Sequence, residues 1–349
     1  MSQKKALIGM SGGVDSSVAA WLMQKQRFSC TGATMRLYGD ASQSIADAKS
    51  VAQALDIDFE VFDLPQEFEQ NVIRAFIEDY EAGLTPNPCI RCNQKLKFGI
   101  FLKLALEKGF DYVVTGHYAQ IRQDPDTGRY LLYKAADSKK DQTYFLACLN
   151  QHQLAHAQFP LGSLTKEEVR LIAEENGFLN ARKRDSQDIC FVPDGDYVAF
   201  MEQYLNKTYP SGNYLDLDGK ILGQHKGAVC YTVGQRKGLG IALGAPAYVC
   251  GKDMQNNTVT LGPNEALFSK ALRANDWNWF PFPTLTEPMQ VEAKIRHSQF
   301  AQKAVVIPEE NGFARVEFLE PQRAISPGQA VVLYDGDLVI GGGTIRQAL

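Results

Sequence analysis

Along the first part of the chain, short apolar runs alternate with longer segments whose apolar residues recur three or four positions apart. The runs at residues 6–10, 30–35, 59–62 and 112–115 are typical of buried strands in a parallel sheet. Between them, segments such as residues 66–82 have the apolar spacing of a helix. This alternation predicts an α/β fold built on a doubly wound parallel sheet.

The pattern changes after Leu205, where short alternating stretches and turns with glycine or proline replace the helical spacing. Residues 214–217 are typical of this part, and no long helix is predicted beyond it. Residues 271–279 are expected to join two small β units, of which the second resembles a barrel. The predicted domains are an α/β domain at 1–205, a small central β domain at 206–270 and a β-barrel-like domain at 271–349.

The composition is that of a soluble globular protein, since 45% of the 349 residues are hydrophobic and 22% are charged. No apolar run is long enough to span a membrane, and the first residues lack the core of a signal peptide. We therefore expect a cytoplasmic protein with no membrane partner. The net charge of −4 argues against indiscriminate binding of nucleic acid but is compatible with a basic face.

A loop of small residues at positions 11–16 follows the first apolar run and precedes a predicted helix. Its adjacent glycines, Gly12 and Gly13, let the backbone approach a bound group closely, and Ser11 and Ser16 offer hydroxyl groups. A helix N-terminus beside such a loop favours phosphate, so the stretch predicts an anion-binding cradle. The alternative is a serine-rich turn that caps an ordinary helix. The spacing matches neither the Gly-Lys-Ser/Thr loop nor the spaced-glycine dinucleotide loop.

The loop is similar to the Ser-Gly-Gly-x-Asp-Ser loop of the ATP pyrophosphatases, which split ATP into AMP and pyrophosphate. This resemblance implies that the loop holds the phosphates and that Asp15 is available to Mg²⁺. Met35 and Gly116 follow other predicted strands, so they are expected at the same sheet edge as walls of an adenine pocket. For Met35 the alternative is a plain core position. The expected ATP-binding residues are Gly9, Met10, Ser11, Gly12, Gly13, Val14, Asp15, Ser16, Met35 and Gly116.

Two cysteines, Cys89 and Cys92, lie where a break with two prolines is followed by a helix predicted to begin near Asn93. A helix N-terminus lowers the pKa of a thiol and favours the reactive thiolate, so a chemical role is expected. A third candidate, Cys190, follows the basic residues 182–184, which could stabilise a thiolate, contact a phosphate backbone or form a solvated turn. A disulfide, a zinc site, a redox pair and inert thiols are the alternatives. The cysteines expected to be inert are Cys30, Cys148, Cys230 and Cys250.

Several blocks, in order along nearly the whole chain, resemble the motifs of tRNA-specific 2-thiouridylases, which install sulfur on the wobble uridine of certain tRNAs. The blocks are residues 11–18, 85–88 with 92–93, 115–118, 140–145, 185–186 with 189–191, 234–240 and 326–329. The resemblance implies that ATP, with Mg²⁺, adenylates the C2 oxygen of the uridine and that a cysteine persulfide then supplies sulfur. By motif match, Cys190 resembles the persulfide-bearing cysteine and Cys92 its nucleophilic partner, with a Cys92–Cys190 disulfide as a product.

The resemblance also implies contacts with tRNA. Asn87, Pro88 and Cys89 are expected to line the flipped-out target base. The other residues at matching positions are His117, Lys140, Asp141, Gln142, Arg296, His297 and Gln329, with Arg236 and Lys237 as a further basic loop. The implied partners are tRNAs with Lys-, Glu- or Gln-type wobble-uridine anticodons and a sulfur donor such as a cysteine desulfurase or a sulfur-relay protein. For each exposed cation taken singly, the alternative is an ordinary surface charge.

One position departs from the family pattern, because many members have an acidic residue where this chain has Cys89. A thiol cannot be assumed to act as the general base proposed there. Cys89, Cys92 and Cys190 could instead hold an iron–sulfur cluster, so a persulfide relay and a cluster-dependent thiolation both stay open. Two further hypotheses are a small-molecule ligase of the ATP pyrophosphatase superfamily and a non-enzymatic tRNA-binding or iron–sulfur carrier protein.

Overall fold

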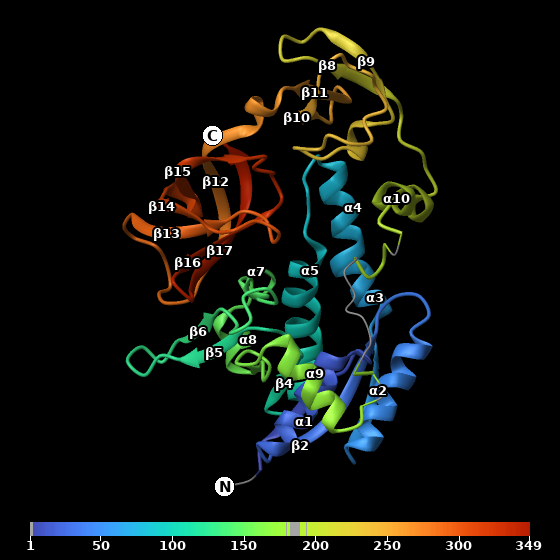
Figure 1. The fold of residues 1–349 in the computed structure, drawn as a ribbon, viewed down its shortest axis with the longest axis vertical. Coiled ribbons are helices and arrows are strands. Elements are labelled where there is room, and N and C mark those ends of the chain that lie inside the picture. Colours follow the sequence, from blue (N-terminus) through green and yellow to red (C-terminus); the bar gives the residue numbers. More distant parts are fainter. Residues whose placement is uncertain (1–2, 179, 182–188, 193) are drawn as a thin grey trace.

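The computed structural model describes residues 3–178, 180–181, 189–192 and 194–349. Figure 1 shows an α/β unit at the N-terminal end of the molecule, a small β sheet at the opposite end and a β barrel next to both. The chain runs from the α/β unit to the small sheet and then back to the barrel. None of the helices in the described ranges is long and apolar enough to cross a membrane.

A five-stranded parallel sheet forms the centre of the α/β unit, in the order β3-β2-β1-β4-β7. Both faces are covered, because Ala6, Leu7 and Ile8 of β1 are fully buried although they point alternately to the two faces. The four predicted strands are all present, and the prediction of a parallel α/β sheet is confirmed. The strands are β1 (Lys5–Gly9), β2 (Ser29–Arg36), β3 (Asp58–Asp63), β4 (Tyr112–Val114) and the short β7 (Ala157–Gln158).

Helices pack on the two faces of this sheet. One face is covered by α1 (Val14–Lys25), α2 (Ser42–Ala54) and α9 (Lys166–Glu175), whose apolar side chains share a core with β1. The other face is covered by two long helical stretches in which α- and π-helical turns follow one another without a break. These are α3 (Pro65–Phe68), η1 (Glu69–Ile73) and α4 (Arg74–Glu81), then α5 (Pro88–Arg91), η2 (Cys92–Phe101) and α6 (Leu102–Glu107).

The break between these two stretches contains the prolines that predict it, since residues 84–87 are not helical. The second stretch begins at Pro88 rather than near Asn93, because proline fits the first helical position, where its missing N–H group is not needed. Cys89 and Cys92 therefore lie within the first two turns of one continuous helical stretch.

Between β4 and α9 the chain leaves the α/β core and returns to it. It forms the hairpin of β5 (Gln120–Gln123) and β6 (Tyr130–Tyr133), followed by the short helices α7 (Thr143–Leu146) and α8 (Gln151–Ala155). α9 then begins with a capping box, in which Thr165 and Glu168 bond reciprocally. The position of Lys166, the first residue of α9, is fixed by this cap.

A four-stranded sheet, in the order β10-β11-β8-β9, forms the small unit. It follows α10 (Tyr197–Leu205) and packs around Tyr214, Tyr231 and Val249. As predicted, no long helix follows Leu205 in this fully described part of the chain, where helical structure is limited to short 3₁₀ turns. The elements are β8 (Gly212–Leu215), β9 (Ile221–His225), η3 (Ala228–Cys230), β10 (Tyr248–Asp253), β11 (Thr258–Gly262) and η4 (Asn264–Leu267).

Six antiparallel strands close into a barrel, because β12 pairs with both β15 and β17. Residues 271–279, expected to join two small β units, form most of β12, the first strand of the barrel. Asn275 and Asp276 hide the strand pattern, because the pairing with β17 shifts register there and Asp276 has a φ of 54°. The elements are β12 (Phe268–Trp279), β13 (Met289–Lys294), β14 (Gln302–Pro308), η5 (Glu310–Gly312), β15 (Ala314–Arg323), β16 (Ala330–Asp335) and β17 (Leu338–Ala348).

The β5–β6 hairpin joins the barrel to the α/β unit. β6 extends the barrel sheet by pairing with β17, where Tyr133 is opposite Leu338. In the same hairpin, the Arg129 side chain donates to three barrel carbonyl oxygens, within residues 279–282, at 2.6–3.2 Å. A charged donor that satisfies three backbone acceptors fixes the two units relative to each other.

Candidate active site

The loop between β1 and α1 leaves the beginning of α1 open. α1 follows Gly13, and no side chain of the described residues caps its first N–H groups. The Ser16 and Ser17 hydroxyls donate to the Gly13 carbonyl oxygen at 3.1 and 3.0 Å, and Ser16 Oγ accepts from the Ser11 N–H at 3.2 Å. These hydroxyls therefore fold the loop instead of capping the helix, and the helix N-terminus is left available to an anion.

Gly12 and Asn180 hold this loop in place. Gly12 has a φ of +70°, and a Cβ there would lie 2.9 Å from the carbonyl oxygen of Ser44 on α2. Asn180 donates to the Gly12 carbonyl oxygen at 3.2 Å and to Ser17 Oγ at 2.9 Å. The loop thus packs between α2 and the segment that follows α9, and these contacts fix its conformation without a ligand.

Gly116 lies directly against the loop. A Cβ at this position would be 2.8 Å from the carbonyl carbon of Asp15 and 2.9 Å from the amide nitrogen of Ser16, closer than any side chain allows. The end of β4 and the beginning of α1 therefore touch through their backbones. This contact agrees with the expectation that both belong to one site.

Met35 lies at the same edge of the sheet. The parallel register pairs Gly9 with Ala33, so Met35 follows at the height of the loop, where it is half-buried. Met10 and Val14 are buried, so they can offer a ligand backbone atoms rather than side chains. The structure thus brings together the three chain segments expected to bind ATP, while the contacts with ATP stay a prediction.

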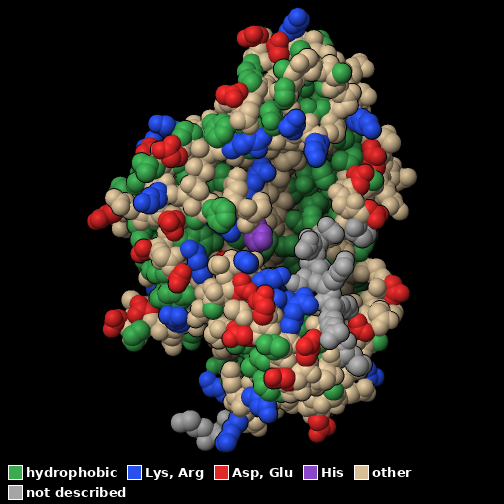
Figure 2. Space-filling model, in the orientation of Figure 1, with side chains coloured by type: hydrophobic (Ala, Val, Ile, Leu, Met, Phe, Trp, Pro, Cys, Tyr) green, Lys and Arg blue, Asp and Glu red, His purple; other side chains and the backbone are tan. Residues whose placement is uncertain are grey.

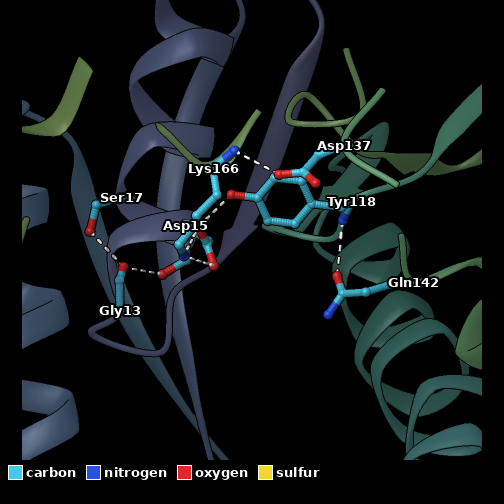
Figure 3. A network of polar contacts seen from close by, with 8 residues as sticks. Gly13, Asp15, Ser17, Tyr118, Asp137, Gln142 and Lys166 are labelled. Carbon is cyan, nitrogen blue, oxygen red and sulfur yellow. Dashed lines mark hydrogen bonds and ion pairs between the residues drawn. The ribbon is translucent and has the colours of Figure 1, made fainter. Parts of the chain in front are cut away.

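Asp15, the expected ligand of Mg²⁺, is held by two side chains (Figure 3). Lys166 Nζ lies 2.7 and 2.8 Å from its two carboxylate oxygens, and the Tyr118 hydroxyl donates to Oδ1 at 2.8 Å. Among the residues that the structure describes, no three His, Cys, Asp or Glu side chains gather closely enough to hold a metal ion. The Asp15 carboxylate is paired with an ammonium group and 30% of its side chain stays exposed, so binding of Mg²⁺ by Asp15 together with phosphate oxygens stays a prediction.

The candidate cysteines come from two segments that pack against each other. Asn87 and the buried Pro88 begin the helix that contains Cys89 and Cys92. Cys190 precedes Phe191, whose buried ring packs on aromatic rings of α3, α4 and α10 at 5.2–5.7 Å. This aromatic anchor fixes the backbone of Cys190, while its own side chain stays exposed.

Desolvation by the surrounding chain raises the pKa of all three thiols, although Cys89 and Cys190 lie at the surface, and this opposes the thiolate expected at a helix N-terminus. For Cys89 and Cys92, burial is the largest cause, and the Lys97 ammonium opposes it. For Cys190, burial together with Cys92 and Cys89 raises the pKa to about 11, and Lys97 again lowers it. Desolvation disfavours the anion more than nearby positive charge favours it. The predicted effect of residues 182–184 lies outside the described residues.

The cysteines form neither a disulfide nor a metal-binding group. All seven are free thiols, Cys92 and Cys190 included. Cys89, Cys92 and Cys190 all lie in described parts of the chain, where no group of three metal-ligating side chains is found. They influence one another electrostatically, but in this arrangement they do not fit an iron–sulfur cluster, which needs its thiolates on adjacent iron atoms.

Lys97 connects the cysteines with the nucleotide loop. It lies on η2 and lowers the pKa of each of the three thiols and of His117. Burial, and then Lys97, lower the pKa of His117 well below its usual range, so its imidazole is neutral. The ring packs between Phe98 and Phe159, and Nδ1 lies 2.7 Å from the Thr115 hydroxyl. Since His117 follows Gly116, Lys97 acts on the thiols and on a residue beside the 11–16 loop, and a single site that includes both stays a prediction.

Three domain models match the chain in order. They are a tRNA methyl transferase HUP domain at residues 4–194, a tRNA methyl transferase PRC-barrel domain at 198–263 and an aminomethyltransferase β-barrel domain at 269–345. The tRNA-specific 2-thiouridylase MnmA of Acetivibrio thermocellus is 48% identical, with 99% of this chain and 100% of that protein covered. MnmA of Clostridioides difficile is 47% identical, with 99% of each chain covered. The chain belongs to the tRNA-specific 2-thiouridylase family.

Membership of the 2-thiouridylase family confirms the resemblance drawn from the motifs. Two of the domain models have methyl transferase names, whereas these full-length relatives are named for thiolation. Among solved structures, a 4-thiouridine synthetase–RNA complex with bound ATP is 17% identical, with a TM-score of 0.36 and 58% of this chain and 50% of that chain covered. At this score it adds nothing to the family assignment.

In this 2-thiouridylase family member, residues expected to contact tRNA gather where the barrel meets the α/β unit. Gln329 donates to the Thr85 carbonyl oxygen at 3.0 Å and accepts from the Tyr144 hydroxyl at 3.3 Å. The His297 ring packs on Phe145, with ring centroids 4.4 Å apart. Figure 2 shows a histidine near the middle of one face, with Lys and Arg side chains around it. This arrangement agrees with a basic face on an acidic protein.

Other residues expected to contact tRNA also make hydrogen bonds within the protein. The Arg296 guanidinium donates to Ser326 Oγ at 2.6 Å and to the Val233 carbonyl oxygen at 3.1 Å, which links the barrel to the chain of the small unit. Gln142, which follows Lys140 and Asp141, accepts from the Tyr118 N–H at 2.9 Å. These bonds fix the Arg296 and Gln142 side chains within the protein, and the contacts of these residues with tRNA stay predictions.

No motif in the sequence of this 2-thiouridylase family member marks Lys166 or Lys97, although Lys166 contacts Asp15 and Lys97 acts on the candidate thiols. Lys166 lies 151 positions after Asp15, at the first position of a capped surface helix, and nothing local marks its partner. Lys97 lies among other lysines on a helix that already contains the candidate cysteines. The carboxylate of Asp15 suggests that a cationic partner exists, but the sequence does not show which lysine or arginine it is.

Proposed function

We propose that this chain is an ATP-dependent tRNA 2-thiouridylase that acts on the C2 oxygen of a wobble uridine. The proposal rests on an open helix N-terminus at the 11–16 loop together with the three thiols beside Lys97. Adenylation needs the helix N-terminus at the 11–16 loop to bind phosphates, and sulfur transfer needs the thiols. Full-length identity to proteins named for this reaction supports the same conclusion.

In the first step, the uridine C2 oxygen attacks the α-phosphorus of ATP, and the bond to the bridging oxygen of the β-phosphate breaks. Pyrophosphate leaves, and the C2 oxygen becomes part of an AMP leaving group. The loop N–H groups and the beginning of α1 stabilise the charge on the phosphates. Asp15 is occupied by Lys166, so no step here depends on a metal ion bound to it.

In the second step, a persulfide on Cys190 attacks C2, and AMP leaves. The Cys92 thiolate then attacks Cys190 Sγ, the S–S bond breaks, and its electron pair stays on the sulfur bound to C2 as 2-thiouridine. A Cys92–Cys190 disulfide forms, which a reductant must reopen before the next turnover. Lys97 stabilises the thiolates of both cysteines. Cys89 is a further thiol beside the base, with Asn87 and Pro88.

The expected partners are a tRNA of the Lys, Glu or Gln type and a persulfide donor such as a cysteine desulfurase or a sulfur-relay protein, in the cytoplasm. His117, Lys140, Asp141, Gln142, Arg296, His297 and Gln329 are proposed to contact the tRNA near the anticodon. Because the described thiols do not form a cluster site, the proposed sulfur transfer uses the cysteine persulfide and no iron–sulfur cluster. Residues 1–205, 206–270 and 271–349 are proposed as the three domains.

The test is thiolation of a wobble-uridine tRNA with ATP and a persulfide donor, followed by mass spectrometry of the nucleosides and measurement of pyrophosphate. Cys190→Ser is expected to abolish 2-thiouridine while tRNA-dependent release of pyrophosphate continues. Cys250→Ser is the matched control, because this thiol lies on β10 of the small unit. Thiolation by Cys190→Ser at the wild-type rate would refute the persulfide role. Activity that depends on stoichiometric iron would require the three thiols to rearrange into ligands.

A further inference from the structure

The phosphate-binding loop contains a carboxylate and no basic residue. Its sequence, Ser-Gly-Gly-Val-Asp-Ser at residues 11–16, has Asp15 as its one ionisable side chain. A triphosphate carries several negative charges, and a carboxylate a few ångströms away repels it by an amount that depends on the local dielectric. The loop N–H groups carry partial positive charges that are smaller than the charge of one carboxylate. A cation from elsewhere in the chain would offset the charge of this carboxylate.

Lys166 supplies that cation. Its ammonium contacts both oxygens of Asp15 at 2.7 and 2.8 Å, and 7% of its side chain is exposed. The carboxylate is more open, with 30% of the Asp15 side chain exposed. The pair therefore leaves its negative partner partly open at the surface and buries its positive partner.

The surroundings hold Lys166 in this position from several sides (Figure 3). The backbone N–H of Lys166 donates to Asp137 at 3.0 Å, and Thr165 caps the helix directly before it. The Tyr118 ring lies 5.9 Å from the ammonium, and the Tyr118 hydroxyl donates to Asp15 at 2.8 Å. The segments of Tyr118 and Lys166, both far from Asp15 in the sequence, thus converge on its carboxylate.

We propose that Lys166 is a positioning residue of the nucleotide site, which neutralises Asp15 so that the loop can accept the phosphates of ATP. This inference rests on the proposed use of ATP. A buried ion pair contributes little to stability compared with an apolar pair of similar size, so stability alone does not explain it. Removing the cation leaves an uncompensated carboxylate at the phosphate site, and the cost grows with the charge of the ligand.

The experiment measures the dissociation constants of AMP, ADP and ATP by calorimetry, with EDTA present so that no metal ion contributes. Lys166→Met is expected to weaken ATP binding about tenfold or more and AMP binding much less, because the repulsion scales with phosphate charge. Lys166→Arg should retain most of the affinity. The double variant Asp15→Asn/Lys166→Met should bind ATP within about threefold of Asp15→Asn, because the charge that needs compensation is gone.

The matched control is Lys103→Met, which breaks an exposed ion pair with Glu107 on α6. Thermal unfolding of each variant shows whether it folds, and the double variant stays informative if Lys166→Met does not. Equal losses for AMP and ATP would overturn the inference in favour of a purely structural pair. A double variant as weak as Lys166→Met would overturn it in favour of direct contact between Lys166 and phosphate. Failure of the wild type to bind ATP would overturn the proposed function, and the inference with it.

Discussion

Cys190 is exposed, yet it is expected to react slowly with an alkylating reagent. Burial and the two neighbouring thiols raise its pKa to about 11, compared with about 8.5 for a free cysteine. At pH 8 the thiolate fraction then falls from about one quarter to about one thousandth. A thiolate of higher pKa is intrinsically more nucleophilic, which recovers about tenfold of this difference. The net expectation is a rate about twentyfold below that of the same residue in the unfolded chain.

The assay follows modification of the Cys190 peptide by iodoacetamide with mass spectrometry, in buffer and in denaturant, from pH 7 to 9.5. In the folded protein the rate should rise about tenfold per pH unit over this whole range, because the pKa lies above it. In denaturant the rate should level off near pH 9. A folded-state rate that equals or exceeds the denatured rate at pH 8 would refute the reasoning. Such a rate would mean that nearby positive charge lowers the pKa of the Cys190 thiol more than desolvation raises it.

Three further predictions test other parts of the structure. Gly116→Ala forces a Cβ within 2.9 Å of the α1 backbone, so ATP binding should weaken by about 1–3 kcal/mol in calorimetry, whereas Gly251→Ala, where the Cβ has open space, should not change it. Arg129→Ala removes hydrogen bonds to three barrel carbonyl oxygens, so the free energy of unfolding measured in urea titrations should fall by about 1–3 kcal/mol. An unchanged urea midpoint would contradict the view that Arg129 holds the hairpin to the barrel. Lys97→Met removes a cation that lowers thiol pKa values, so the pH profile of thiolation should move to higher pH, and an unmoved profile would contradict this role.

The sequence predicts the fold well where a pattern is local. The apolar runs of β1 and β4 are buried on both faces, and this burial is why they form continuous apolar stretches, whereas the edge strand β3 leaves Val61 exposed. The strand β12 is not predicted, because Asn275 and Asp276 interrupt the alternation at a register shift. A strand held by partners on both sides tolerates such an interruption, and those partners are distant in sequence.

The candidate site is predictable to the extent that its chemistry is carried by short motifs. The loop at residues 11–16 and the cysteine positions are of this kind. The charge state of the thiols is not, because desolvation depends on all the chain that packs around Cys89, Cys92 and Cys190. The partner of Asp15 is not predictable either, because a single lysine on a capped helix carries no local sign of what it will contact.

The pairing of β6 with β17 has a consequence for how the protein is made. β17 follows β6 and β12 in the chain, so it is synthesised after them, and the same strand closes the barrel against β12. Until it arrives, the β5–β6 hairpin of the nascent chain presents an unpaired edge, beside the buried side chain of Leu132. A polypeptide cut short before Leu338 would lack both pairings. Closure of the barrel and pairing of the β5–β6 hairpin with it therefore depend on the same strand.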